Sequence, residues 1–188
     1  AVTTDNAYAS GARIEKQAID YFIATKNNAV LDGGLVIFAA GNDAKAMSGY
    51  PGAYRDYISV TAFSPDYLPA YYTNYGPGCN VAAPGGDASI SPAGTSAAQV
   101  LSTLPSELYQ SDYGYMQGTS MACPHVSGAC ALAVSYYYGA EKRKGLTGEM
   151  LRQALLSSTQ SVDRYCTGKY QQYLGNMGIG SLDTYKLL

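Results

Sequence analysis

The chain has 188 residues, of which 47% are hydrophobic, and a formal net charge of −2. This size and composition suit one ordinary globular domain, or most of one, and exclude a disordered or collagen-like chain. Because the charged residues are scattered and of both signs, we expect no nucleic acid and no anionic membrane surface among the partners.

No apolar run in the sequence is long enough to cross a bilayer, so we expect no membrane span. The cysteines form no C-x-x-C pair, which disfavours a zinc site. If Cys123 and Cys130 shared a helix, roughly 10 Å of rise would separate them, which is too far for a mutual disulfide. Bridges through Cys79 or Cys166 stay open at this point.

The first predicted element is an amphipathic helix over 11–28, where apolar residues recur at helical spacing between charged ones. After a glycine-rich break, an uninterrupted apolar run at 35–40 has the length of a strand and is typical of a parallel strand covered on both faces. Further strands are predicted at 57–62 and, shorter, at 80–83, between loops rich in Gly, Pro, Ser and Asn.

Two helices are predicted in the second half of the chain. The first runs from Met121 to about Tyr138 with small residues that we expect to be buried nearly all round, and Pro124 places its start close to Ser120. Thr147 is the predicted N-cap of the second. The order of strands and helices predicts an α/β fold with a parallel β-sheet flanked by helices.

Ser120 follows Gly118 and Thr119 at the predicted start of a helix. A hydroxyl there lies at the positive end of the helix dipole, which is where an acyl-transfer nucleophile should be placed. For an isolated Gly-Thr-Ser, a simple capping role is the better interpretation. However, the whole string G-T-S-M-A-C-P-H-V-S-G at 118–128 resembles the nucleophile motif of the subtilisin-like serine proteases, the subtilases, and favours the catalytic role.

Other segments carry the same resemblance in the same order. A-A-G-N at 39–42 resembles the family segment whose asparagine donates to the oxyanion. G-Y-P-G at 49–52 is similar to the base of the pocket for the residue before the scissile bond, and G-I-G-S-L-D at 178–183 resembles the usual family end. The resemblance implies a subtilisin-like three-layer sandwich, with residues 1–188 as the C-terminal portion of one peptidase domain that is incomplete at the N-terminal side.

The resemblance also implies a function, which is serine endopeptidase activity on protein or peptide substrates through an acyl-enzyme on Ser120. The oxyanion hole would consist of the Asn42 amide and the Ser120 backbone N–H. It implies no cofactor for the chemistry, no metal at the site and a secreted or cell-envelope location. Structural calcium is left open, because no acidic cluster has a readable ligand spacing. The implied substrate-binding residues are Ala39, Ala40, Gly41, Gly49 and Thr119.

The sequence departs from the family pattern in one respect. Family members carry a D-[ST]-G and an H-G motif earlier in the chain, and neither occurs here. The only histidine, His125, would lie roughly 7.5 Å along the helix and about 140° round from Ser120, so we interpret it as a buried imidazole bonded to backbone. We expect the triad Asp and His in a missing N-terminal part of the same domain, and this chain alone to be inactive.

Three alternative functions compete with this hypothesis. The G-x-S-x-G elbow of α/β-hydrolases requires an acid and a histidine after the serine, and no histidine follows His125. A Ser-Lys enzyme requires a lysine near the site, whereas Lys142 and Lys144 fall at or beyond the far end of the predicted helix. The third alternative, a catalytically silent pseudoprotease or peptide-binding module that keeps the cleft, stays open.

Overall fold

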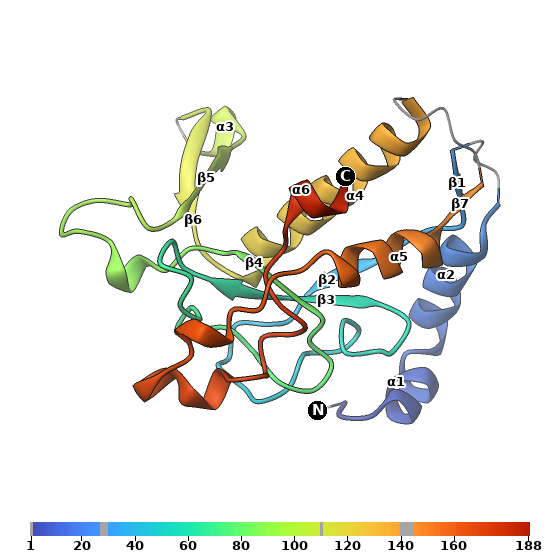
Figure 1. The fold of residues 1–188 in the computed structure, drawn as a ribbon, viewed down its shortest axis with the longest axis horizontal. Helices are drawn as coiled ribbons and strands as arrows, with labels where there is room; N and C mark the ends of the chain where they lie inside the picture. Colours follow the sequence, from blue (N-terminus) through green and yellow to red (C-terminus); the bar gives the residue numbers. More distant parts are fainter. Residues whose placement is uncertain (1, 27–29, 110, 140–144) are drawn as a thin grey trace.

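The structure is a computed structural model that describes residues 2–26, 30–109, 111–139 and 145–188 (Figure 1). At its centre is a parallel three-stranded sheet in the order β2-β3-β4, in which Val60 of β3 pairs with Ala39 on one side and Val81 on the other. The strands predicted at 35–40, 57–62 and 80–83 are confirmed with their ends shifted by up to two residues. Their bounds are Ile37–Ala39 for β2, Ile58–Phe63 for β3 and Val81–Pro84 for β4.

The central strand β3 is buried along its whole length because both faces of the sheet are covered. On one face, α4 (Thr119–Gly139) packs against all three strands. On the other face, Phe63 and Ala82 pack against a segment that contains the short 3-10 helices η2 (Asp163–Tyr165) and η3 (Gly168–Tyr173). This layering confirms an α/β fold with a parallel sheet flanked by helices.

The predicted N-cap of the next helix is also confirmed. Thr147 precedes α5 (Gly148–Ser157), and its Oγ1 accepts a hydrogen bond from Met150 N at 3.1 Å. Leu151 and Leu155 of α5 are buried in the same core as α4. The chain ends in the short helix α6 (Thr184–Leu187) beside α4, so all three helices cover one side of the sheet (Figure 1).

The expectation that the long helix is buried nearly all round is wrong. Its start at Thr119 agrees with the position of Pro124, but only one face of α4 is buried. Leu132, Tyr136 and Tyr138 on the other face are 49%, 43% and 42% exposed. The physical reason is that the described sheet covers a single side of the helix.

The single helix predicted at 11–28 is replaced by two helices, α1 (Asp5–Gly11) and α2 (Arg13–Ala24). Residues 27 and 28 of that prediction lie outside the described residues, as do Lys142 and Lys144. No residue of α2 is buried, and Ile14 on its apolar face is 85% exposed. The amphipathic pattern is therefore present, but the described chain leaves its apolar face uncovered.

Several elements were not predicted from the sequence. The strands β5 (Val100–Thr103) and β6 (Tyr113–Met116) form an antiparallel hairpin with α3 (Ser106–Tyr109) at its tip, which stands off from the body (Figure 1). The chain passes directly from β6 into α4, so this hairpin leads to Ser120. The remaining elements are the short parallel pair β1 (Leu31–Asp32) and β7 (Leu146–Thr147) and the 3-10 helix η1 (Ala88–Ile90).

Cys123 and Cys130 share α4, as the sequence predicted, and all four cysteines are free in this structure. Among the residues that the structure describes, no helix combines the length and apolar character needed to cross a membrane.

Candidate active site

Ser120 is the second residue of α4, and it is exposed. The chain enters the helix through Gly118, whose N–H donates to Gly85 O at 2.9 Å and whose φ of 149° favours glycine. Gly118 O then accepts from Met121 N at 2.9 Å. As a result, the Ser120 hydroxyl and backbone N–H lie at a helix N-terminus, where the dipole stabilises negative charge.

Asn42 lies just beyond the carboxyl end of β2, and α4 fixes the orientation of its side chain. Asn42 Oδ1 accepts hydrogen bonds from Thr119 N and Thr119 Oγ1, both at 2.8 Å. Because a backbone N–H can only donate, the atom that faces it must be the amide oxygen. The Nδ2 group of Asn42 is then left as the donor, and within the described part of the chain it has no acceptor.

Two N–H donors from different elements converge beside Gly118. A methyl group placed on Gly118 would lie 3.5 Å from Asn42 Nδ2 and 3.6 Å from Ser120 N. The missing side chain of Gly118 leaves the space between the donors open. An arrangement of this kind can bind a developing oxyanion without reorganisation, which is a large source of rate enhancement in acyl transfer.

A buried tyrosine supports the turn that carries Gly118. Tyr72 is 6% exposed, and the single proton of its hydroxyl is shared between Gly85 O at 2.9 Å and Gly86 O at 2.6 Å. Burial raises the pKa of Tyr72 well above its usual range, so the hydroxyl stays protonated as a donor. Gly85 O in turn accepts from Gly118 N, which links the buried tyrosine to the start of α4.

The residues expected to contact substrate lie around this turn. Gly49 N donates to Ala40 O at 2.8 Å, so the two segments expected to wall the specificity pocket lie side by side. Ala40 and Thr119 are fully buried, whereas Ala39 and Gly41 are half-buried and Gly49 is exposed. The Thr119 hydroxyl also accepts from Gly41 N at 3.2 Å. A substrate-binding role for these residues stays a prediction.

The expectation that His125 is buried is wrong, because the residue is exposed. Its expected bond to backbone is present, since Nδ1 lies 2.8 Å from Met121 O one helical turn earlier. The side chain lies on a face of α4 that the three-stranded sheet does not cover, which explains its exposure.

One residue of the site was missed by the sequence analysis. Asn74 is 3% exposed and lies beneath the loop that carries Asn42, where its side chain bonds to the backbone on either side of that residue. The signal in the sequence is weak, because an asparagine in a loop beside glycine and proline is typical of a turn.

The described residues contain no group of three or more His, Cys, Asp or Glu side chains that could hold a metal ion, and structural calcium stays a prediction. Burial raises the pKa of each cysteine thiol, to about 12 for Cys79 and to about 11 for Cys130. Two of these cysteines are buried and two half-buried, and thiols kept neutral in this way are unsuited to nucleophilic catalysis. Ser120, in contrast, presents an exposed hydroxyl at a helix N-terminus, and its role as nucleophile stays a prediction.

Solved structures of proteases share this α/β fold, so the fold places the chain in a class of protease-like structures. A lanthipeptide protease aligns with a TM-score of 0.66 and 23% identity over 97% of this chain and 54% of its own. A protease from Pseudoalteromonas arctica PAMC 21717 aligns with a TM-score of 0.61 and 30% identity over 81% of this chain and 41% of its own.

The sequence then identifies the family, since the profile of the Subtilase family matches residues 3–180. The chain belongs to the subtilase family. Subtilisin DY of Bacillus licheniformis is 33% identical over 85% of this chain and 50% of its own length. The thermophilic serine proteinase of Bacillus sp. strain AK1 is 31% identical over 87% of this chain and 36% of its own length. This chain thus spans half or less of these relatives.

Proposed function

We propose that this chain is part of a serine endopeptidase, with Ser120 as the nucleophile and Asn42 Nδ2 and the Ser120 backbone N–H as oxyanion donors. The observation that carries the proposal is the convergence of the two donors within 3.6 Å of one point beside Gly118. The subtilase family and its serine protease relatives favour the same chemistry.

In the proposed reaction, a histidine removes the Ser120 proton as Oγ attacks the carbonyl carbon of a peptide bond. The carbonyl oxygen becomes an oxyanion between the two donors. The carbon–nitrogen bond then breaks, and the histidine donates the proton that it took from Ser120 to the leaving amine. Water hydrolyses the resulting ester between Ser120 and the acyl group, which restores the serine and releases the acid.

We propose that the base and its aspartate come from an upstream part of the same domain, and that this chain alone is inactive. His125 is unsuited to the role, because it lies past the first turn of α4 and bonds to Met121 O. Without a base, the Ser120 hydroxyl is a weak nucleophile.

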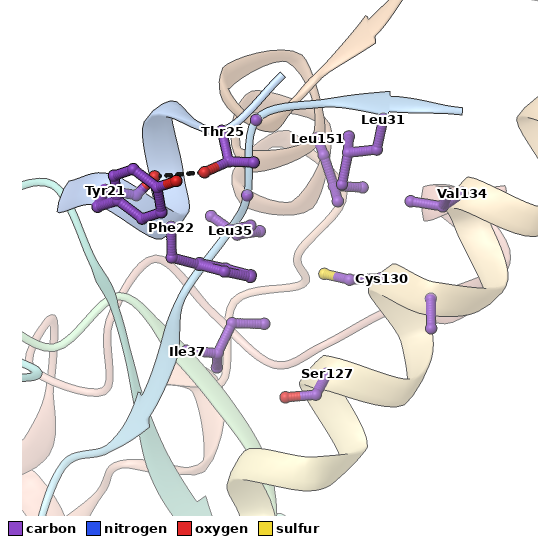
Figure 2. A pocket seen from close by; sticks show the side chains of 13 residues that line it. Tyr21, Phe22, Thr25, Leu31, Leu35, Ile37, Ser127, Cys130, Val134 and Leu151 are labelled. Atoms are coloured by element: carbon purple, nitrogen blue, oxygen red, sulfur yellow. Dashed lines mark hydrogen bonds between the residues drawn. The ribbon is translucent and has the colours of Figure 1, made fainter. Parts of the chain in front are cut away.

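An apolar groove supports this arrangement. It has a volume of about 700 Å³ and lies between α2, the chain around β2 and the middle of α4 (Figure 2). Its lining includes Phe22, Leu35, Ile37, Cys130, Val134 and Leu151. In the described chain β2 pairs along one edge only, with β3. We propose that the upstream part of the domain fills this groove and pairs with the free edge.

The second candidate function is a pseudoprotease or peptide-binding module that retains the cleft without turnover. It applies if no upstream part of the protein supplies the D-[ST]-G and H-G motifs, which this sequence does not contain. The two candidates differ in whether Ser120 is activated, which a mechanism-based reagent measures directly.

We also propose a secreted or cell-envelope location. Relatives include the extracellular protease of Xanthomonas campestris, which is 34% identical over 76% of this chain, and the extracellular basic protease of Dichelobacter nodosus, 36% identical over 55%. The major intracellular serine protease of Bacillus subtilis, 35% identical over 68%, shows that the family is not confined to one compartment. Cell fractionation with an antibody to this chain tests the location.

The test of the proposed function is fluorophosphonate labelling of the source protein, with the labelled residue located by peptide mapping. We expect labelling at Ser120 in a species that also contains the upstream part, and none in the Ser120→Ala variant. Absence of labelling in the intact source protein would favour the binding module. Labelling of the isolated chain would contradict the proposed need for an upstream base.

A further inference from the structure

The loop that carries Asn42 has little packing of its own. Residues 42–46 are exposed, and the loop contains two residues with positive φ, Gly41 at 110° and Ala44 at 52°. Left-handed backbone is unfavourable for alanine and persists only where surrounding contacts enforce it. Something other than side-chain burial must therefore hold this loop in place.

The buried side chain of Asn74 makes these contacts. Its Nδ2 donates to Ala40 O at 3.0 Å, before Asn42 in the chain. Its Oδ1 accepts from Asp43 N and from Lys45 N, both at 3.0 Å, after Asn42 in the chain. A single amide thus bonds to the backbone on both sides of the proposed oxyanion donor.

The backbone around Asn74 strengthens the same link. Asn74 N donates to Gly41 O at 3.0 Å, and Tyr75 N donates to Lys45 O at 3.0 Å. A side chain on Gly41 would collide with Asn74 Nδ2, so glycine is required there for contact as well as for its φ. Gly41 and Asn74 therefore fit one another, and the turn into Asn42 depends on both.

We propose that Asn74 is a positioning residue of the oxyanion hole, which acts by fixing the loop so that Asn42 Nδ2 faces the space beside Gly118. Asn74 does not touch the oxyanion itself. Thr119 orients the Asn42 amide from the side of α4, while Asn74 holds the backbone of residues 40–45 from the side of the sheet. This inference rests on the proposed function, because it assigns Asn74 a role in that site.

The main test compares Asn74→Ala with Asn80→Ala in the full-length protein that contains this chain. Asn80 is the control, because it is a half-buried asparagine before β4 whose Oδ1 accepts from Ser59 N of β3, at 2.7 Å, and not from the 40–45 loop. Active sites are counted by fluorophosphonate titration, and kcat and KM are measured on a peptide substrate. We expect Asn74→Ala to lower kcat about 10- to 100-fold and to change KM less than about twofold. This decrease in kcat is equal to or smaller than the decrease caused by removing a whole oxyanion donor.

Double variants separate positioning from stability. If Asn74 acts through Asn42, adding Asn74→Ala to Asn42→Ala should lower kcat by less than about threefold further, since the two residues serve one interaction. If Asn74 only stabilises the fold, both Asn74→Ala and Asn80→Ala reduce the titrated sites and leave kcat per site unchanged. That second result would overturn the proposal.

Amide hydrogen exchange gives a test that needs neither turnover nor a folded variant. In the unmodified protein, the amides of Asp43 and Lys45 should exchange slowly although their residues are exposed, because Asn74 Oδ1 accepts from both. Rapid exchange at both amides would overturn the positioning role. A source protein that fails to label at Ser120 would refute the proposed function, and the exchange result would still decide whether Asn74 holds the loop.

Discussion

Thr119 holds Asn42 by two hydrogen bonds to one oxygen, from the Thr119 backbone N and from its hydroxyl, both at 2.8 Å. The same hydroxyl accepts from Gly41 N, so it bridges the start of α4 and the loop after β2. The donor and the nucleophile of the proposed site are therefore coupled through the residue between Gly118 and Ser120. This coupling makes the geometry of the site sensitive to a buried hydroxyl that need not touch substrate.

The first prediction concerns this hydroxyl. Thr119→Val keeps the shape of the side chain but loses both of its hydrogen bonds, so Asn42 should lose part of its orientation. We expect kcat to fall about tenfold, equivalent to about 1.4 kcal/mol, with KM little changed. Thr119→Ser is the matched control, because it keeps the hydroxyl and loses only a methyl group. Steady-state kinetics that show equal losses in the two variants would contradict the prediction.

The second prediction concerns His125, which we exclude as the general base. His125→Asn retains a donor that can reach Met121 O but cannot act as a base near neutral pH. We expect kcat to change less than about threefold, and the acidic limb of the pH–rate profile to persist with the same apparent pKa. Disappearance of that limb, or a loss of more than about a thousandfold, would show that His125 takes part in proton transfer.

The sequence predicted the three strands of the central sheet, α5 and the start of α4, because each depends on local signals. An apolar run predicts a covered parallel strand, Thr147 predicts an N-cap, and Pro124 restricts where its helix can begin. The hairpin of β5 and β6 was missed, because its side chains are mostly exposed and carry no clear apolar alternation. The burial of α4 was overestimated, because composition alone does not say how many sides a sheet will cover.

The resemblance to the subtilases predicted from the sequence that Ser120 and Asn42 lie in the same site. It could not assign the roles of Tyr72 or Asn74. Both are polar groups whose partners are backbone atoms of loops distant in the sequence, and such pairings depend on the tertiary fold. Such residues are recognised by their burial in the structure. A buried amide or hydroxyl is expected to have its hydrogen bonds made, so its partners show which part of the fold it holds.

The third prediction concerns oxidation of Met121, which directly follows the proposed nucleophile, Ser120. Its sulfur lies 3.7 Å from the position that a methyl group on Gly118 would take, next to the two donors. Conversion to the sulfoxide would place a polar oxygen beside this space. We expect dilute peroxide to reduce turnover of the full-length enzyme at least about tenfold and the Met121→Leu variant to resist. Parent enzyme that keeps full activity when mapping shows Met121 oxidised would contradict this.

The fourth prediction concerns the thiols. All four cysteines are free, and burial raises the pKa of each, to about 11 for Cys130 and about 12 for Cys79. Because the thiolate is the reactive form, a disulfide reagent at pH 8 should modify these positions in the native protein at least about 100-fold more slowly than in the unfolded protein. Peptide mapping after timed labelling measures each site. Rapid native labelling of the half-buried Cys79 or of the buried Cys130 would contradict their raised pKa values.

The fifth prediction concerns Asp5, which joins the N-terminus of α1 to the loop before β3. Burial alone would raise the pKa of Asp5, but hydrogen bonds from Arg55 and Tyr50, at 2.6 and 2.9 Å, together with the charge of Arg55, lower it below its ordinary value. Asp5 therefore binds protons more weakly in the folded protein than in the unfolded chain. Its contribution to stability is present above the unfolded pKa of about 3.9 and is lost as the pH falls through the lower folded pKa.

The variant Asp5→Asn tests this linkage. At pH 7 we expect a decrease in Tm of at most about 3 °C, because a partly exposed ion pair contributes little. The difference from the parent should shrink as the pH falls below about 4, where protonation of Asp5 removes the same interaction from the parent protein. Glu107→Gln, in the exposed helix α3 at the tip of the hairpin, is the control for the loss of one negative charge. A Tm difference for Asp5→Asn that stays constant from pH 7 to pH 3 would show that the lowered pKa does not contribute to stability.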